Sequence, residues 1–257
     1  LEGLLGAFEG QEEPWVECEV DADLKKEEYG LLIPAEGPIR LTAGSQRGIR
    51  DGLVTLAQLV KLNGGRGGAA IPAMQISDSP AFARRGVMLD VSRDRIPKMP
   101  QFMEILDTLA LLKFNHLQLY TEHTFAYAGH EEVWEGWSPL TADEIRTLDA
   151  ACIERGIELA ANQNCFGHMV PWLKLPKYAH LAETHGDWMF DIWARSGPFS
   201  LCPTDPASLE FVKGLLGELL PCFSSPLANI GCDETYDIGF GRSKAEVEKC
   251  GRAAVYM

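Results

Sequence analysis

The sequence predicts an α/β fold, a TIM-type (β/α) barrel of which the first four strand–helix units are present, preceded by a small α+β domain. Two observations support this. From residue 82 onward, apolar strand-like runs alternate with amphipathic helical runs, which is the pattern of a parallel sheet. Long loops follow the strands, as in barrels that carry their working groups at the strand carboxyl ends. We expect an α+β accessory domain at residues 1–80 and the N-terminal half of a catalytic barrel at residues 81–257.

The first 80 residues contain three strand-like segments and one helix. Residues 16–20 alternate apolar and acidic side chains as a half-buried strand does, and residues 29–33 and 39–42 are two further candidates. After Gly48, apolar residues recur every three or four positions, which predicts an amphipathic helix that ends near Gly64. These elements form a small unit distinct from the segment that follows.

Residues 82–257 repeat the order strand, helix, strand. The predicted strands cover residues 87–91, 116–120, 157–161 and 228–231, and the predicted helices cover 99–112, 141–155 and 206–220, with another starting in 244–257. Thr141 and Glu144 have capping-box spacing at the start of the second helix. Eight units need roughly 250 residues, so half a barrel is missing. Either the chain was cut, or a four-unit sheet is complete and its open edge predicts a homo-oligomer.

Composition excludes two classes of function. With 46% hydrophobic residues, 23% charged residues and a formal net charge of −14, the chain is globular and lacks the clustered Lys and Arg that bind nucleic acid. No apolar stretch approaches the roughly 20 residues that span a bilayer, so we expect no membrane partner. A neutral or cationic partner fits this charge better.

The cysteines indicate free thiols. Seven are scattered at wide intervals without the Cys-x-x-Cys spacing of a zinc or redox site. This pattern favours a reducing compartment and thus a cytoplasmic location. The first residue is Leu1 rather than Met, so localisation stays open.

Polar side chains follow each predicted barrel strand, and the carboxyl ends of parallel strands meet at one mouth. They are Asp90, Ser92 and Arg93 after the first strand, Glu122 and His123 after the second, Asn164 and His168 after the third, and Asp233 and Glu234 after the fourth. Two adjacent carboxylates suit acid catalysis, because like charges raise the pKa of one of them. Neighbouring residues on a regular strand point to opposite faces, so this pair requires a bend, which Gly231 allows.

Three motifs now carry a family resemblance. Residues 85–93 read Arg-Gly-Val-Met-Leu-Asp-Val-Ser-Arg and resemble the first barrel strand of glycoside hydrolase family 20, the β-N-acetylhexosaminidases. Residues 155–159 followed by Phe166-Gly167-His168 resemble its third strand and Pro-Gly-His turn, and residues 228–234 resemble its fourth strand, His-x-Gly-Gly-Asp-Glu. Residues 1–80 resemble the domain that precedes that barrel. The resemblance covers the N-terminal portion of such an enzyme.

The resemblance implies removal of terminal N-acetylhexosamine from glycans by a substrate-assisted retaining mechanism without metal or cofactor. Glu234 would be the general acid, and Asp233 would orient the 2-acetamido group that attacks the anomeric carbon. Arg85 would hold the sugar hydroxyls and His168 would support the acid. Glu122 and Asn164, at neighbouring strand ends, are further candidates for substrate binding.

The chain departs from the family pattern in several places. Asn229 stands for the usual His, Cys232 for the second Gly and Phe166 for the Pro, and the second strand ends in residues 120–125, Tyr-Thr-Glu-His-Thr-Phe, instead of His-Leu-Thr-Asp-Asp-Gln. The family's acetamide-clamping Tyr lies on strands five to eight. We therefore expect a fragment ending at Met257 to be inactive alone.

Two other functions stay open. A non-catalytic carbohydrate-binding or scaffold protein could retain half of the barrel without its chemistry. A metal-dependent hydrolase could use Asp233 with the histidines, of which His116, His123 and His130 recur every seven residues. That spacing places the three on no shared face of a strand and loop, which argues against a zinc site.

Overall fold

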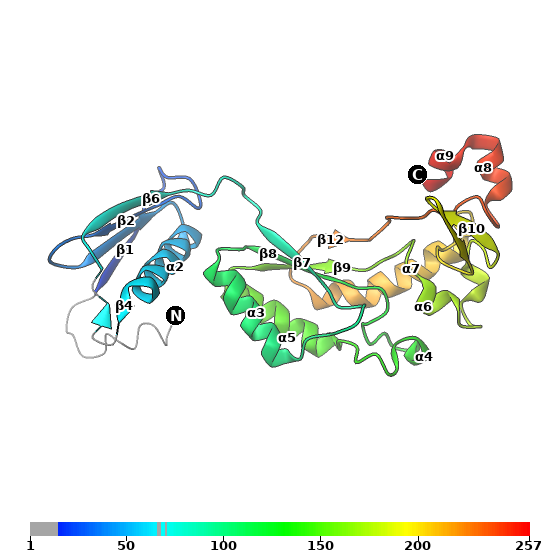
Figure 1. The fold of residues 1–257 in the computed structure, drawn as a ribbon, viewed down its shortest axis with the longest axis horizontal. Helices are drawn as coiled ribbons and strands as arrows, with labels where there is room; N and C mark the ends of the chain where they lie inside the picture. The colour runs from blue at the N-terminus through cyan, green and yellow to red at the C-terminus, as the bar shows by residue number, and fades with distance from the viewer. Residues whose placement is uncertain (1–14, 66–67, 70) are drawn as a thin grey trace. The chain divides into compact units, whose positions relative to one another are not determined.

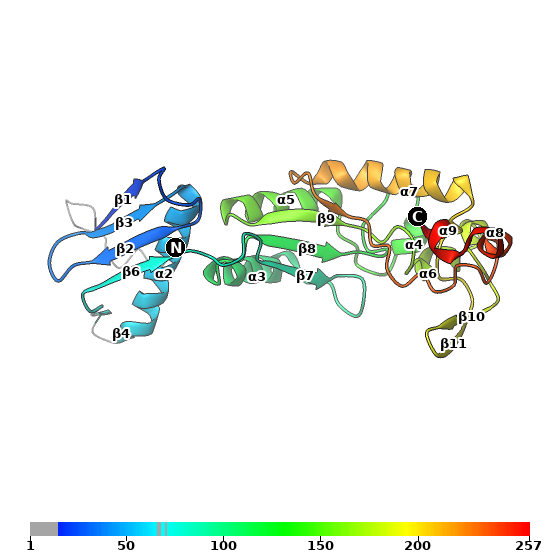
Figure 2. The ribbon, with the colours of Figure 1, turned by 90° about the horizontal axis from the view of Figure 1, so that it is seen from above.

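The computed structural model describes residues 15–65, 68–69 and 71–257, which form two compact units (Figures 1 and 2). The first unit comprises Leu1–Arg85 with Asp107–Asn115, and the second comprises Gly86–Leu106 with His116–Met257. In the part of the chain that is described, no helix combines the length and apolar character needed to cross a bilayer.

The first unit is a four-stranded sheet covered by one helix. Its strands are β1 (Val16–Val20), β2 (Tyr29–Ile33), β3 (Ile39–Ala43) and β6 (Met74–Asp78), in the order β1-β3-β2-β6. Only the β1–β3 pair is parallel. Helix α2 (Gln46–Asn63) lies on one face of the sheet (Figure 1), and the short strands β4 (Gly64–Gly65) and β5 (Gly68–Ala69) pair after it.

Helix α2 has a local start signal and a close contact with the sheet. The Ser45 hydroxyl accepts hydrogen bonds from the amides of Arg47 at 3.2 Å and Gly48 at 3.4 Å, as capping residues do. Gly52 lets the helix approach β3, because a Cβ there would collide with the side chain of Leu41. The buried core of this unit includes Tyr29, Leu31, Leu41, Ile49 and Leu56.

The second unit contains the predicted parallel sheet. Its strands are β7 (Gly86–Asp90), β8 (His116–Tyr120), β9 (Glu158–Asn162) and β12 (Ala228–Asn229), in that spatial order. All three pairings are parallel. Helices α3 (Met99–Leu111), α5 (Ala142–Glu154) and α7 (Pro206–Leu219) lie along one face (Figure 1). The alternation read from the sequence is thereby confirmed as a parallel sheet with helical crossovers.

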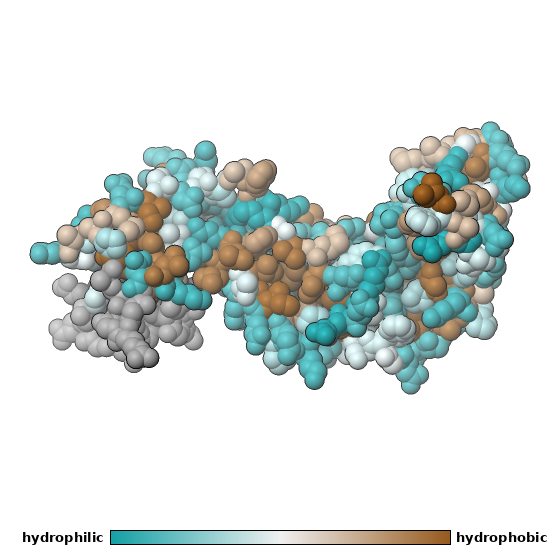
Figure 3. Space-filling view, in the orientation of Figure 1, coloured by the Kyte–Doolittle hydropathy of each residue, from teal (hydrophilic) through white to brown (hydrophobic). Residues whose placement is uncertain are grey.

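The opposite face of this sheet carries no helix of the described chain (Figures 1 and 2). Met88 on β7 is 51% exposed, and Figure 3 shows apolar and hydrophilic side chains side by side on the second unit. On this open face, the Gln118 carboxamide oxygen accepts from Asn162 Nδ2 at 3.0 Å and Asn229 Nδ2 at 3.1 Å. The open face therefore carries a hydrogen-bonded polar group near the strand ends.

Several local predictions are confirmed or corrected. The capping box at α5 is present, with Thr141 Oγ1 accepting from the Glu144 amide and Glu144 Oε2 from the Thr141 amide. Strand β12 stops at Asn229, two residues before the predicted end, because Gly231 has φ +48°. Strand β6 was not predicted, since its Gln, Ser and Asp lower strand propensity.

The long loops contain short elements. They are α4 (Glu131–Trp134), α6 (Val170–Leu173), η2 (Ala179–Leu181), the hairpin strands β10 (Asp187–Phe190) and β11 (Trp193–Ser196), η3 (Leu220–Cys222), α8 (Lys244–Cys250) and α9 (Arg252–Tyr256). The sequence predicted a loop where the hairpin forms, because Asp191-Ile192 between its strands is not a typical hairpin turn. The seven cysteines are free.

Candidate active site

The parallel register brings polar residues from four segments to one edge of the sheet. Asp90 is paired with Tyr120 across β7 and β8, and Asn162 with Asn229 across β9 and β12. The loops that follow these strands therefore start side by side. They hold the groups described below.

His168 is the centre of the cluster. Its Nε2 atom lies 3.2 Å from Glu234 Oε2 and 3.7 Å from Asp233 Oδ2, and its Nδ1 atom lies 3.6 Å from Glu122 Oε1. The side chain is 11% exposed, and its ring packs edge-on against Phe199 at 4.9 Å. His168 has φ +58°, an uncommon conformation for a residue with a Cβ. One imidazole thus faces three carboxylates.

The two adjacent acids reach the same nitrogen because the chain turns after β12. The Asn229 side-chain oxygen accepts from the Gly231 amide at 3.0 Å, and both Gly231 (φ +48°) and Glu234 (φ +55°) have left-handed backbone conformations. Extended backbone would send the two carboxylates to opposite faces. The Asp233 and Glu234 side chains are 61% and 44% exposed, so both are open to a ligand.

The loops after β9 and β12 are pressed together at two glycines. A Cβ on Gly167 would lie 2.7 Å from the Asp233 carbonyl oxygen, and a Cβ on Gly231 would collide with Asn164 Oδ1. Asn164 is fully buried and donates to the Thr121 carbonyl at 3.2 Å. Its side chain therefore lies under the turn, although the sequence suggested contact with substrate.

Glu122 is fixed by groups from β7 and β8. Its Oε1 atom accepts from Arg93 Nη2 at 2.8 Å and from the Tyr120 hydroxyl at 3.0 Å, and its amide donates to Ser92 Oγ at 2.6 Å. Burial, together with the Glu122 charge, raises the pKa of Tyr120. The phenol thus stays protonated and continues to donate.

Arg93 belongs to the cluster and Arg85 does not. Arg93 Nη2 lies 3.4 Å from His168 Nδ1, and its Nη1 lies 3.5 Å from Asp90 Oδ2. Arg85 precedes β7, about 16 Å from the carboxyl end of this five-residue strand. The sequence favoured Arg85 as the sugar-binding residue, whereas the structure places Arg93, and not Arg85, beside Glu122 and His168.

Arg85 instead has structural partners in the first unit. Its guanidinium donates to both Glu27 carboxylate oxygens at 3.1 and 3.2 Å and to the carbonyls of Phe82 and Lys113. Burial acts to raise the pKa of Glu27, but the hydrogen bond and charge of Arg85 outweigh it and lower that pKa. Arg85 is therefore fully engaged away from the cluster.

Among the described residues, the other histidines belong to no group of three or more His, Cys, Asp or Glu side chains spaced to hold a metal ion. His116 lies 3.5 Å from Glu158, His123 packs on Trp137, and His130 Nδ1 lies 2.6 Å from the Tyr178 hydroxyl. In contrast, ligand atoms of His168, Asp233 and Glu234 all lie within 4.8 Å of one another. These three side chains, which lie at the carboxyl edge of the sheet, are therefore spaced so that they could hold a cation.

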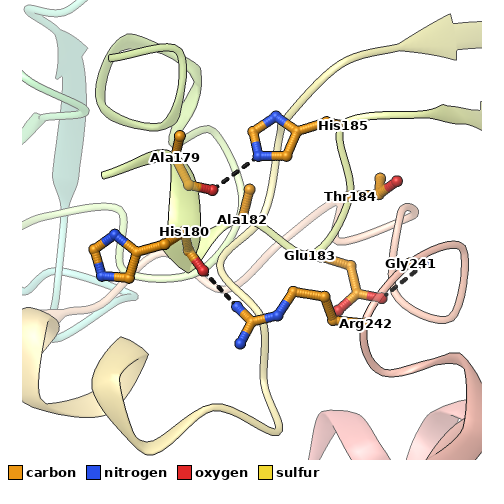
Figure 4. Close-up of a pocket in the computed structure, with 8 residues that line it drawn as sticks. All are labelled: Ala179, His180, Ala182, Glu183, Thr184, His185, Gly241 and Arg242. Carbon is orange, nitrogen blue, oxygen red and sulfur yellow. Dashed lines mark hydrogen bonds between the residues drawn. The ribbon is translucent and has the colours of Figure 1, made fainter. Parts of the chain in front are cut away.

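A buried carboxylate anchors the loop that follows the acids. Glu183 Oε1 accepts from the amides of Gly239 at 3.2 Å, Gly241 at 3.1 Å and Ser243 at 3.1 Å, and from the Ser243 hydroxyl at 2.7 Å. Figure 4 shows Glu183 beside Gly241, where it lines a shallow pocket with Arg242. The segment after Glu234 is thus tied to the loop after η2.

Comparison with known proteins agrees with these features. Residues 8–79 match the model of glycosyl hydrolase family 20, domain 2, and residues 121–253 match that of the family 20 catalytic domain. Beta-hexosaminidase subunit A1 of Dictyostelium discoideum is 28% identical over 216 residues, covering 81% of this chain and 39% of that protein. Beta-hexosaminidase of Vibrio furnissii is 29% identical over 241 residues, covering 80% and 37%. The chain therefore spans less than half the length of these relatives.

Solved structures share the fold. Flavobacterium johnsoniae chitobiase superposes with a TM-score of 0.75 at 26% identity, covering 91% of this chain and 36% of that one. An exo beta-N-acetylglucosaminidase from Vibrio harveyi, in complex with N-acetylglucosamine, gives a TM-score of 0.75 at 23% identity and covers 92% and 41%. Both units of this chain fall within these alignments in large part.

Proposed function

The chain belongs to glycosyl hydrolase family 20, and from this premise we propose that it removes terminal N-acetylhexosamine residues from glycans by substrate-assisted retaining hydrolysis. The observation that carries the proposal is the convergence of Asp233 and Glu234 on His168 Nε2, at 3.7 and 3.2 Å. Two carboxylates that lie within 4 Å of the same nitrogen are close enough to act on one sugar. The adjacent Arg93 and Tyr120 add donors for its hydroxyls.

Glu234 is the proposed general acid. It transfers its proton to the glycosidic oxygen as the bond from that oxygen to the anomeric carbon breaks. His168 lies between Glu234 and Glu122, so its ring is placed to hold the Glu234 carboxyl in position. The same Glu234 carboxylate then takes a proton from the attacking water.

Asp233 is the proposed partner of the acetamido group. The acetamide carbonyl oxygen attacks the anomeric carbon, the leaving group departs with the proton from Glu234, and Asp233 accepts the N–H as positive charge develops on the ring so formed. Water then opens this intermediate and restores the acetamide. Because Asp233 is 61% exposed, it can approach a bound sugar without rearrangement of the core.

Arg93 and Glu122 are the proposed sugar-binding residues, with Arg93 in place of Arg85. The Arg93 guanidinium lies at the carboxyl end of β7 with its charge directed to Glu122 and Asp90. A charged donor and a charged acceptor held together can bind two neighbouring hydroxyls. Asn164 is proposed to support the Gly231 turn.

We also infer that the parallel sheet is the first half of a (β/α) barrel, with residues 1–80 as its accessory domain. The evidence is a four-stranded all-parallel sheet with helices on one face and an open opposite face. The structural neighbours with TM-scores of 0.75 cover nearly all of the chain. A complete barrel would cover the open face and bring further residues to the mouth.

The test is hydrolysis of aryl N-acetylglucosaminide and N-acetylgalactosaminide by the parent protein, extended by any coding sequence that follows Met257, and by its Glu234→Gln and Asp233→Asn variants, with and without a chelator. We expect turnover that survives chelation and falls by at least about 100-fold in each variant. Glu210→Gln, an exposed change on α7, is the matched control and should keep the parent rate. Equal rates on glucosides and N-acetylglucosaminides would contradict the role of the acetamide.

Two other results identify other functions. Loss of turnover on chelation would favour a metal-dependent hydrolase, for which the spacing of His168, Asp233 and Glu234 is the supporting observation. Sugar binding without turnover in the parent would favour a carbohydrate-binding or scaffold protein. These outcomes separate the three functions because each changes a different measurement.

A further inference from the structure

Tyr256 lies against both loops that carry the proposed catalytic groups. Its hydroxyl donates to the Cys232 carbonyl at 2.7 Å, one residue before Asp233. Its ring stacks on the Phe166 ring, with centroids 5.6 Å apart and planes inclined by 19°, two residues before His168. Cys232 and Phe166 are also two of the positions at which this chain departs from the family pattern. One side chain therefore contacts both of these substituted positions.

Helices α8 and α9 bring Tyr256 back to the two acids on an anchored segment. Helix α8 begins after Ser243, whose amide and hydroxyl donate to the buried Glu183 carboxylate at 3.1 and 2.7 Å. Val247 on this helix packs against Gly239, where an added Cβ would lie 3.2 Å from the Val247 side chain. Helix α9 follows after a single residue and contacts α8 (Figure 1). Tyr256 is therefore presented from a supported position.

The backbone, rather than a side-chain hydrogen bond, sets the direction of Asp233. Its Oδ2 atom lies 3.7 Å from His168 Nε2, which is too long for a hydrogen bond. The peptide group that joins Cys232 to Asp233 is planar, so a donor that fixes the Cys232 carbonyl oxygen also fixes the plane from which Asp233 begins. Among the described residues, no donor other than the Tyr256 hydroxyl bonds that oxygen.

We propose that Tyr256 is a positioning residue that holds Asp233 in line with the acetamido group of the bound sugar. This inference rests on the proposed function. Tyr256 touches neither the sugar nor the reacting atoms and acts through the Cys232 carbonyl, while the stack on Phe166 keeps its hydroxyl at that carbonyl. A displacement of about 1 Å at a reacting group can lower the rate about 100-fold, so a small shift of the backbone at Asp233 is sufficient to be measured.

The experiment is a double-mutant cycle between Tyr256→Phe and Asp233→Asn, with kcat and KM measured on an aryl N-acetylhexosaminide. The protein includes any coding sequence that follows Met257. Tyr256→Phe keeps the ring on Phe166 and removes only the hydroxyl, so kcat should fall about 10-fold while KM stays within about 2-fold. In the Asp233→Asn background the same change should lower kcat by less than about 2-fold, because it acts through Asp233.

Tyr178→Phe is the matched control, because it also removes a hydroxyl that has partners. These are His130 at 2.6 Å and Glu132 at 3.1 Å, and neither is a proposed catalytic group. The control should keep kcat and KM within about 2-fold of the parent. An unchanged kcat in Tyr256→Phe, or equal losses with and without Asp233→Asn, would overturn the proposal. A higher KM at unchanged kcat would also overturn it, since Tyr256 would then bind the sugar itself.

Hydrogen exchange separates this inference from the proposed function. The amides of Gly231 and Tyr236, on either side of the Cys232 carbonyl, are both hydrogen-bonded. Both should exchange about 5-fold faster in Tyr256→Phe than in the parent, whether or not the parent shows turnover. Unchanged exchange would show that Tyr256 does not hold this segment and would overturn the inference. Faster exchange in a protein without turnover would contradict the proposed function and leave Tyr256 as the residue that holds the Asp233 segment.

Discussion

Acidification should destabilise the second unit through His123, a buried histidine beside the candidate site. The side chain is 2% exposed, neither ring nitrogen has a hydrogen-bond partner among the described residues, and its ring packs edge-on against Trp137 at 4.8 Å. Burial, with a smaller contribution from the positive charge of Lys174, lowers the pKa of His123 to about 4. The folded protein therefore keeps this ring neutral.

The sign and size follow from proton linkage. In the unfolded chain a histidine has a pKa of about 6.5, so between pH 6.5 and 4 the unfolded state binds more protons than the folded state. Stability is then highest above pH 6.5 and falls as the pH decreases toward 4. With these two pKa values, the loss from pH 7 to pH 5 is about 2 kcal/mol, and it levels off at about 3 kcal/mol below pH 4.

The assay is urea unfolding at pH 7 and pH 5, followed by Trp fluorescence, for the parent and for His123→Phe. The variant keeps an aromatic ring but cannot take up a proton, so the parent should lose about 2 kcal/mol more than the variant over this interval. His185→Gln, a change at an exposed histidine, should behave like the parent. Parallel losses in parent and His123→Phe would refute the assignment, as would a nuclear magnetic resonance titration of His123 with a midpoint near 6.5.

Two further predictions concern the loops around the acids. Glu183→Ala removes the acceptor of three backbone amides in the loop that follows Asp233 and Glu234. It should lower the free energy of unfolding, measured by urea denaturation, by about 3 kcal/mol. The control Glu210→Ala, on the surface of α7, should change this free energy by less than about 0.5 kcal/mol. Gly231→Ala places a Cβ at a residue with φ +48°, where it collides with Asn164. This change should lower the free energy of unfolding by at least about 1 kcal/mol more than Gly197→Ala, because Gly197 has φ +91° but no atom within 4 Å of an added Cβ. Equal losses of stability would show that the contact with Asn164 relaxes freely.

Much of the second unit could be predicted because its pattern is local. Strands β7, β8 and β9 lie within a residue or two of their predicted bounds, and α5 starts at its capping box. The β10–β11 hairpin could not be predicted in the same way, since its aromatic residues follow no alternation with a recognisable turn. Its strands form because Trp188 and Phe190 pack on Phe199, a contact that sequence alone does not reveal.

The same difference between local patterns and long-range contacts applies to the candidate site. Strand ends predicted that Glu122, His168, Asp233 and Glu234 would meet, because parallel strands place such groups at one edge. Arg93 was visible in the sequence at the end of β7, but its distant partners were not. Only the folded chain adds Glu122 at 2.8 Å and His168 at 3.4 Å to its surroundings. The spacing of residues along the sequence therefore does not predict which distant side chains a charged residue contacts.

The orientation of the two acids depends on polar residues beneath them. Gln118 on β8 accepts from Asn229, and Asn229 in turn accepts from the amide of Gly231, where the chain bends before Asp233. Since Asn229 offers both a donor and an acceptor, it can link the sheet interior to the turn in one orientation. An apolar residue at position 229 would leave the Gly231 amide and the Gln118 oxygen short of a partner. The bend that directs both carboxylates to His168 therefore depends on Gln118 and Asn229 in the strands as well as on Gly231.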